Sequence, residues 1–154
     1  MAPYVAVVGP GEATARELDA AEQVGQSLAQ TGAILVCGGL GGVMAAACRG
    51  ARQAGGTTIG LLPGLDRGVA NEWVQIAIPT GLGELRNGLI VRSADAVIAV
   101  GGAYGTLSEV ALALKAGVPV FGLQSWEIDG IERTEEPCEA VQRAVAAGRR
   151  RTSS

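Results

Sequence analysis

A stretch that begins at residue 100, VGGAYGTLSEV, combines residue types that suit contact with a small anion. Gly101, Gly102 and Gly105 lack a Cβ, so their backbone N–H groups can approach a phosphate closely and adopt positive φ angles. Thr106 adds a hydroxyl group and Glu109 a carboxylate. The stretch lies between an apolar run and a helical pattern, and the N-terminus of a helix attracts negative charge. It therefore predicts a loop that binds a phosphorylated ligand.

The same spacing also has a purely structural explanation. Thr106 and Glu109 match the pattern T-x-x-E before an apolar run, which is a capping box that satisfies free N–H groups at a helix start. Thr14 and Glu17 form the same pattern. On spacing alone, a cap is favoured over a catalytic role for Glu109.

Glycine-rich loops also follow the first two predicted strands, in the segments VVGPGEAT and VCGGLGGVM. Neither GGLGGVM nor GGAYGT spells the dinucleotide fingerprint G-x-G-x-x-G, and no loop spells the P-loop G-x-x-x-x-G-K-[ST]. A fourth connection, LLPGLDRGVANE, is long and polar enough to form a rim or lid. In these two glycine-rich segments we expect ligand contacts from Gly9, Gly11, Gly38, Gly39, Gly41, Gly42, Val43 and Met44.

Short β-branched runs alternate with Ala-rich helical stretches, which predicts an α/β fold. The expected strands are Val5–Val8, Ile34–Cys37, Thr58–Leu62, Val74–Ile78, Ala96–Val100 and Val118–Leu123, and the expected helices are Ala13–Thr31, Val43–Ala54, Gly83–Ser93, Thr106–Ala116 and Glu135–Ala147. We expect one Rossmann-like domain over residues 1–148, with a doubly wound, mainly parallel sheet and helices on both faces, followed by a polar tail, 149–154. In such sheets ligands bind beyond the carboxyl ends of the strands.

Composition excludes several kinds of site. The chain has no His, which rules out Ser-His-Asp and Cys-His catalysis and every imidazole metal site, so no metal is expected. Three widely spaced Cys indicate reduced thiols. A net charge of −3 disfavours nucleic acid, and no apolar run reaches the roughly 20 residues that span a bilayer. We expect a cytoplasmic protein without nucleic-acid or membrane partners.

The motifs together resemble the LOG-related nucleotide-binding family, which contains cytokinin-activating phosphoribohydrolases and many members labelled "lysine decarboxylase". The segment NEWVQIAIPTGLGELRNGLIVRSADAVIAVGGAYGTLSE is similar to the short bacterial branch that includes molybdenum cofactor carrier proteins. The resemblance covers residues 4–123 and implies a dimer or larger homo-oligomer.

The resemblance also implies roles for particular residues. The hydrolase motif PGGxGTxxE aligns with residues 101–109, where Gly101 replaces Pro and Ala103 replaces the second Gly. Fifteen residues before it, Arg86 matches a family arginine, while Asn87 replaces a lysine. The resemblance assigns catalysis to Arg86 and Glu109, and ligand contacts to Arg86 and Asn87 and to the loop Gly101, Gly102, Ala103, Tyr104, Gly105 and Thr106.

Three functions remain open, and the sequence favours the first. One is hydrolysis of a nucleoside 5′-monophosphate to free base and ribose 5-phosphate, without a required cofactor. The second is carriage of molybdenum cofactor or a nucleotide as cargo, without cleavage. Sensing of a nucleotide is a third option. Decarboxylation is rejected because a pyridoxal phosphate enzyme needs a Schiff-base lysine, and the sole lysine, Lys115, is remote from the glycine loops.

Overall fold

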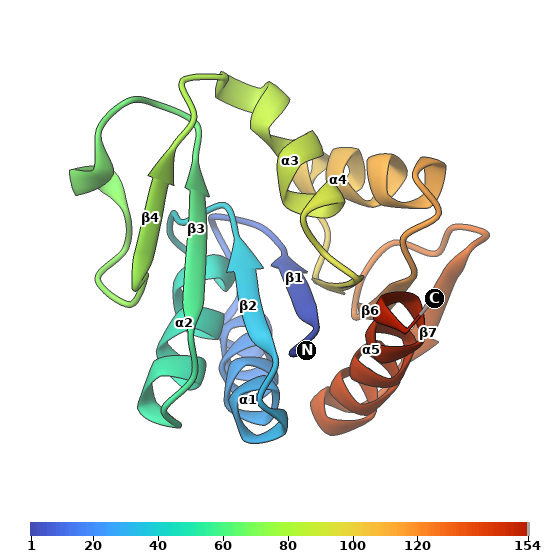
Figure 1. Ribbon diagram of the computed structural model, residues 1–154. Coiled ribbons are helices and arrows are strands. Elements are labelled where there is room, and N and C mark those ends of the chain that lie inside the picture. Colours follow the sequence, from blue (N-terminus) through green and yellow to red (C-terminus); the bar gives the residue numbers. More distant parts are fainter. Residues whose placement is uncertain (154) are drawn as a thin grey trace.

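Seven parallel strands form one sheet in the computed structural model, which describes residues 1–153 (Figure 1). The order is β4-β3-β2-β1-β5-β6-β7, so the chain builds outward from β1 to one edge and then returns to pair β5 with the other side of β1. The strands are β1 Tyr4–Val8, β2 Ile34–Cys37, β3 Thr58–Leu62, β4 Ile76–Pro79, β5 Ala96–Val100, β6 Val120–Leu123 and β7 Ile131–Thr134.

Five α-helices cover the two faces of this sheet. They are α1 Ala15–Thr31, α2 Val43–Gln53, α3 Arg86–Arg92, α4 Tyr104–Lys115 and α5 Pro137–Thr152, and two short 3₁₀ turns lie at Arg67–Val69 and Gly83–Leu85. The protein is a single-domain α/β fold with helices on both faces, as predicted. Among residues 1–153, no helix has the length and apolar character that crossing a membrane requires.

Each face of the sheet has its own apolar core, because β-branched and Ala residues alternate between the two sides of the central strands. Val5 and Val7 of β1 face α1, α2 and α5, whereas Ala6 and Val8 face α3 and α4. All five residues of β5 are fully buried. This packing fixes the strand ends from which the glycine loops emerge.

The structure differs from the predicted elements at several places, among them one additional strand and shifted bounds; the helix α3, for example, covers Arg86–Arg92 instead of Gly83–Ser93. The connector expected between the sixth strand and the last helix contains β7, an edge strand whose residues Glu132 and Arg133 are exposed. The fourth strand begins two residues later than predicted, and the sixth begins at Val120 because Pro119 interrupts the run. Helix α5 continues through Thr152 into the expected polar tail, of which residue 154 lies outside the described residues.

The predicted capping box at the start of α1 is confirmed. The N–H of Glu17 donates to Oγ1 of Thr14 over 3.1 Å, and Oε1 of Glu17 accepts the N–H of Thr14 over 2.9 Å. The other carboxylate oxygen of Glu17 lies where a Cβ on Gly101 would be, only 1.7 Å from that position. The capping residue Glu17 therefore packs directly against Gly101, the first residue of the loop after β5.

Candidate functional site

A pocket opens at the carboxyl ends of β1 and β5, where the strand order reverses. This is the place at which open α/β sheets bind ligands. The pocket has a volume of about 220 Å³. Its lining residues come from the loop after β1, from the first turns of α2 and α3, and from α4: Val8, Gly9, Pro10, Gly11, Met44, Arg86, Asn87, Ala103, Gly105, Thr106 and Glu109.

The predicted capping box at Thr106 and Glu109 is wrong. Helix α4 begins at Tyr104 with Ala103 as its N-cap, so Thr106 lies in the first turn and Glu109 in the second. Both side chains are buried, with Thr106 at 1% and Glu109 at 8% exposure. Within the part of the chain that the structure describes, Oγ1 of Thr106 has no hydrogen-bond partner. Both residues therefore contribute side chains to the pocket rather than to a cap.

Arg86 and Glu109 are brought together in this pocket, although they lie on different helices. Nη1 of Arg86 donates to Oδ1 of Asn87, and the guanidinium lies against Gly38, where an added Cβ would be 2.9 Å from Nη2. Nε of Arg86 is buried and finds no acceptor among residues 1–153. The pocket thus holds two buried donors without partners, a guanidinium N–H and a hydroxyl.

Burial determines the charge state of Glu109. Loss of solvation raises the pKa of its carboxyl group to about 7, and the positive charge of Arg86 opposes this shift. Glu109 is therefore poised to gain or lose a proton near neutral pH. A carboxyl group with a pKa near neutral can exchange a proton with a bound ligand. When it is deprotonated, its negative charge weakens the attraction of the pocket for an anion.

The glycines of the first two loops serve close packing as well as the pocket. A Cβ on Gly9 would lie 2.5 Å from the carbonyl oxygen of Val100, and one on Gly42 would lie 2.3 Å from that of Pro10. Gly42 also has a φ of 64°, which favours glycine. These contacts bring the loops after β1, β2 and β5 close to one another, which forms the pocket floor.

The structure places the other predicted ligand residues around the pocket rather than on its lining. Gly101 contacts Glu17, and a Cβ on Gly102 would lie 3.1 Å from Nε1 of Trp126. Tyr104, for which a ligand contact was expected, is 86% exposed. The remaining predicted residues absent from the lining are Gly38, Gly39, Gly41, Gly42 and Val43.

Sequence reasoning missed Val8 and Pro10, which line the pocket, and two supports behind it. Trp126 follows β6, and its indole Nε1 donates to the carbonyl oxygen of Ala103 over 3.3 Å. Asn71, from the connection expected as a rim or lid, donates through Nδ2 to the carbonyl of Leu40 over 2.8 Å. The connection that contains Asn71 is therefore hydrogen-bonded to the second glycine loop, and none of its residues lines the pocket.

Two buried thiols lie directly behind the second glycine loop. The Sγ atoms of Cys37 and Cys48 are 3.5 Å apart, and the N–H of Gly39 donates to Cys37. The hydrogen bond with Cys37, and then burial, raise the pKa of the Cys48 thiol, so it stays protonated. In the range 1–153, no three Cys, Asp or Glu side chains cluster in a way that could hold a metal ion.

Comparison with known proteins identifies the family. The model of the SLOG cluster4 family matches residues 2–148. The chain belongs to the SLOG cluster4 family. An uncharacterized protein of Archaeoglobus fulgidus is 41% identical over 144 residues, which cover 93% of this chain and 95% of that protein.

Two solved structures share this fold over nearly their whole length. The molybdenum cofactor binding protein of Rippkaea orientalis is 40% identical, with 96% of this chain and 97% of that chain covered and a TM-score of 0.89. The molybdenum cofactor carrier protein of Chlamydomonas reinhardtii is 34% identical, with 96% and 98% covered and a TM-score of 0.87. The expected similarity to molybdenum cofactor carriers is confirmed.

Proposed function

We propose that the chain binds a small phosphorylated ligand in the pocket between β1 and β5, and that this ligand is molybdenum cofactor or a related phosphorylated pterin carried as cargo. The observation that carries this proposal is the pair of buried donors without partners, Nε of Arg86 and Oγ1 of Thr106. A buried donor without an acceptor costs about 1–3 kcal/mol, and a phosphate oxygen would remove that cost.

The size and position of the pocket support a carrier. At about 220 Å³ it is smaller than the roughly 300–1,000 Å³ of sites that enclose a drug-sized ligand. It suits the phosphate end of such a ligand, so the rest would extend past Gly11 and Gly105, where an added Cβ meets nothing within 4 Å. A cargo that protrudes from its carrier is accessible to an acceptor protein. The molybdenum cofactor proteins at 40% and 34% identity support the same choice of ligand.

Loading experiments test this proposal. The purified protein is incubated anaerobically with molybdenum cofactor, freed of excess by gel filtration, and analysed for molybdenum and for the fluorescence of the oxidised pterin. We expect retention by the unaltered chain and at least tenfold weaker retention by Arg86→Gln, which loses the charged donor. Arg92→Gln is the matched control, because Arg92 is an exposed residue at the end of the same helix. Equal retention by both variants would contradict the proposal.

A second candidate is N-glycosidic hydrolysis of a nucleoside 5′-monophosphate, and the pKa of Glu109 near 7 favours it. A carboxylate beside the anomeric carbon can orient water and stabilise positive charge on the ribose ring. Incubation with AMP, GMP, CMP and UMP, followed by chromatography of released base, tests this activity. We expect Glu109→Gln to abolish any release. If the unaltered chain releases no base from any of the four, hydrolysis of these nucleotides is excluded.

A further inference from the structure

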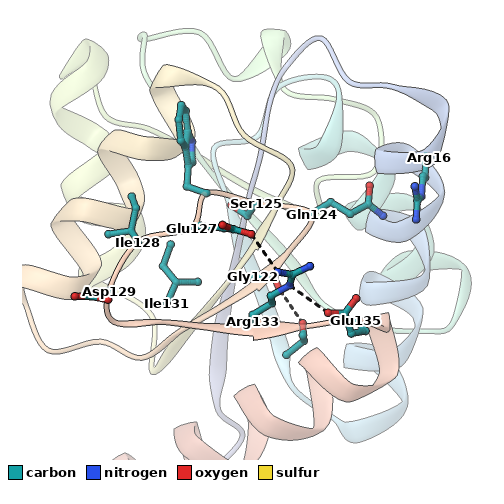
Figure 2. Close-up of a pocket in the computed structure, with 12 residues that line it drawn as sticks. Arg16, Gly122, Gln124, Ser125, Glu127, Ile128, Asp129, Ile131, Arg133 and Glu135 are labelled. Atoms are coloured by element: carbon teal, nitrogen blue, oxygen red, sulfur yellow. Dashed lines mark hydrogen bonds and ion pairs between the residues drawn. The ribbon is translucent and has the colours of Figure 1, made fainter.

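A second and larger cavity lies along β6 and β7 and is lined by the segment that connects them; it shares no lining residue with the pocket between β1 and β5. Its volume is about 550 Å³, which is within the usual range for a small-molecule site. Figure 2 shows Arg16 and Gln124 at one side of this cavity and Ile128 and Ile131 at the other. It exists because β7 pairs with β6 and holds the connecting segment above the sheet edge.

Arg16 is placed where helix electrostatics oppose it. It is the second residue of α1, close to the positive end of the helix dipole, where a cation is unfavourable. No ion pair or hydrogen bond to Arg16 is found among residues 1–153. A guanidinium without a partner at a helix N-terminus, on the wall of a cavity, is suited to one anionic group of a ligand.

The same wall contains one residue with an unusual backbone conformation and one with an unsatisfied side chain. Gln124 has a φ of 52°, and it is the one residue other than glycine with a positive φ in the described part of the chain. Such strain is concentrated at functional positions in proteins. The next residue, Ser125, has a buried Oγ with no hydrogen-bond partner within residues 1–153. Both residues line the cavity. A residue with an unusual backbone conformation and a residue with an unsatisfied hydroxyl group are therefore neighbours in its wall.

The opposite part of the cavity combines apolar side chains with one carboxylate, that of Asp129. Trp126, Ile128 and Ile131 contribute an indole ring and two branched side chains, which suit a planar ring. Between the two parts, Arg133 pairs with Glu127 over 3.1 Å and with Glu135 over 3.2 Å. Because these two carboxylates outnumber the guanidinium that they share, the centre of the cavity disfavours a ligand with several negative charges.

We propose that this cavity is a second ligand site, which binds an aromatic or heteroaromatic ring bearing one anionic group, a carboxylate or a monophosphate. The ring packs on Trp126, Ile128 and Ile131, and the anionic group pairs with Arg16 beside the amide of Gln124. This proposal does not depend on which ligand the first pocket binds. Because Trp126 also donates to the carbonyl of Ala103, a ligand here contacts a support of the first pocket.

Tryptophan fluorescence tests the second site. The chain contains two Trp, so Trp73→Phe leaves Trp126 as the single reporter. Nicotinate represents the carboxylates, and AMP and GMP represent the monophosphates, each titrated to millimolar concentration with a calorimetric titration in parallel. We expect at least one probe to quench Trp126 saturably. If none of the three binds by either method, the proposal is overturned.

Two arginine variants in that background assign the binding to one cavity. We expect Arg16→Gln to weaken the quenching of Trp126 by the probe about tenfold or more, because a charge-assisted hydrogen bond is lost. Arg16 is exposed, so folding should be unaffected, which thermal melting checks. Quenching that is weakened by Arg86→Gln and not by Arg16→Gln would place the probe in the first pocket and overturn the proposal. Failure of cofactor loading, by contrast, would leave these titrations unchanged.

Discussion

Single residues set the properties of the pocket between β1 and β5. Arg86 is half-buried and Thr106 is buried, and each has a buried polar atom without a hydrogen-bond partner in the described chain. Such groups reduce the stability of the folded protein and persist where a ligand needs them. Their surroundings support two predictions.

The first concerns Glu109 and pH. The pKa of its carboxyl group is about 7 in the folded protein, against an ordinary value of 4.5 for a solvated glutamate, so between these values the folded state binds more protons. The free energy of unfolding therefore decreases as pH rises from about 5 to 7, by at most about 3 kcal/mol from this group. Glu109→Gln should lose that dependence. Urea unfolding of both proteins at pH 5, 6, 7 and 8 measures it, and parallel pH profiles would show that Glu109 is not responsible.

The second concerns Thr106. Thr106→Val keeps the side-chain shape and removes the unsatisfied hydroxyl, so the ligand-free protein should gain about 1 kcal/mol of stability. The same variant should bind the phosphorylated ligand more weakly, because a donor is lost. Chemical unfolding and cofactor retention measure the two effects. A destabilised variant would mean that the hydroxyl has an unrecognised partner in the folded protein.

At the scale of elements, the pocket depends on how helices begin. The cap of α1 contacts Gly101, and Trp126 after β6 contacts the N-cap of α4. Neither contact could be inferred from the sequence, because each joins residues that are more than 20 positions apart. The start of α4 was misjudged for a related reason. Thr106 and Glu109 match a capping box by spacing. The helix begins two residues earlier, at Tyr104, so both residues lie inside it.

Gly101 and Gly105, which lie before and after the start of α4, make a matched pair for mutation. Gly101 has a φ of 72° and lies against Glu17, so Gly101→Ala should destabilise the protein by about 2 kcal/mol or more through strain and disruption of the α1 cap. Gly105 lies within α4 with open space around its Cα, so Gly105→Ala should stabilise by up to about 1 kcal/mol. Gly105→Ala should also weaken ligand binding, because its methyl group enters the pocket. Thermal unfolding and cofactor retention compare the pair.

At the scale of the whole molecule, the alternation of apolar strands and Ala-rich helices was sufficient to predict the fold. Buried strands such as Ala96–Val100 are apolar throughout and are visible in the sequence. Strand β7 was missed because Ile131–Thr134 is an exposed edge strand with two charged residues. The cavity beyond it could not be predicted without that strand. The pocket between β1 and β5 was predictable, because glycine loops mark the strand ends that border it.

The expected homo-oligomer remains a prediction, and the fold offers a surface for it. Helices α3 and α4 pack on β1, β5 and β6, and α3 also contacts β3, whereas the edge strand β4 lies beyond them in the sheet (Figure 1). Ile76 and Ile78 of β4 are 46% and 43% exposed there, and Leu85 and Leu89, just before and on α3, are exposed as well. We expect this surface to pair with a second copy, because burying each side chain contributes about 1.5–3 kcal/mol.

Light scattering after gel filtration tests this prediction. Ile78→Glu should convert the oligomer to a monomer, since a charge would be buried without a partner. Leu112→Glu is the matched control on α4, where the exposed fraction is a similar 38%. If the control dissociates the oligomer and Ile78→Glu does not, the interface lies on α4 instead.

The pairing of β1 with β5 also governs when the pocket first exists. Its floor needs Val8, close to the start of the chain, and Glu109, about a hundred positions later. A nascent polypeptide emerging from the ribosome exposes the first two glycine loops well before it exposes α3 and α4. If the pocket binds its ligand as proposed, binding during synthesis is impossible until most of the chain has been translated, and a product terminated before α4 lacks the site.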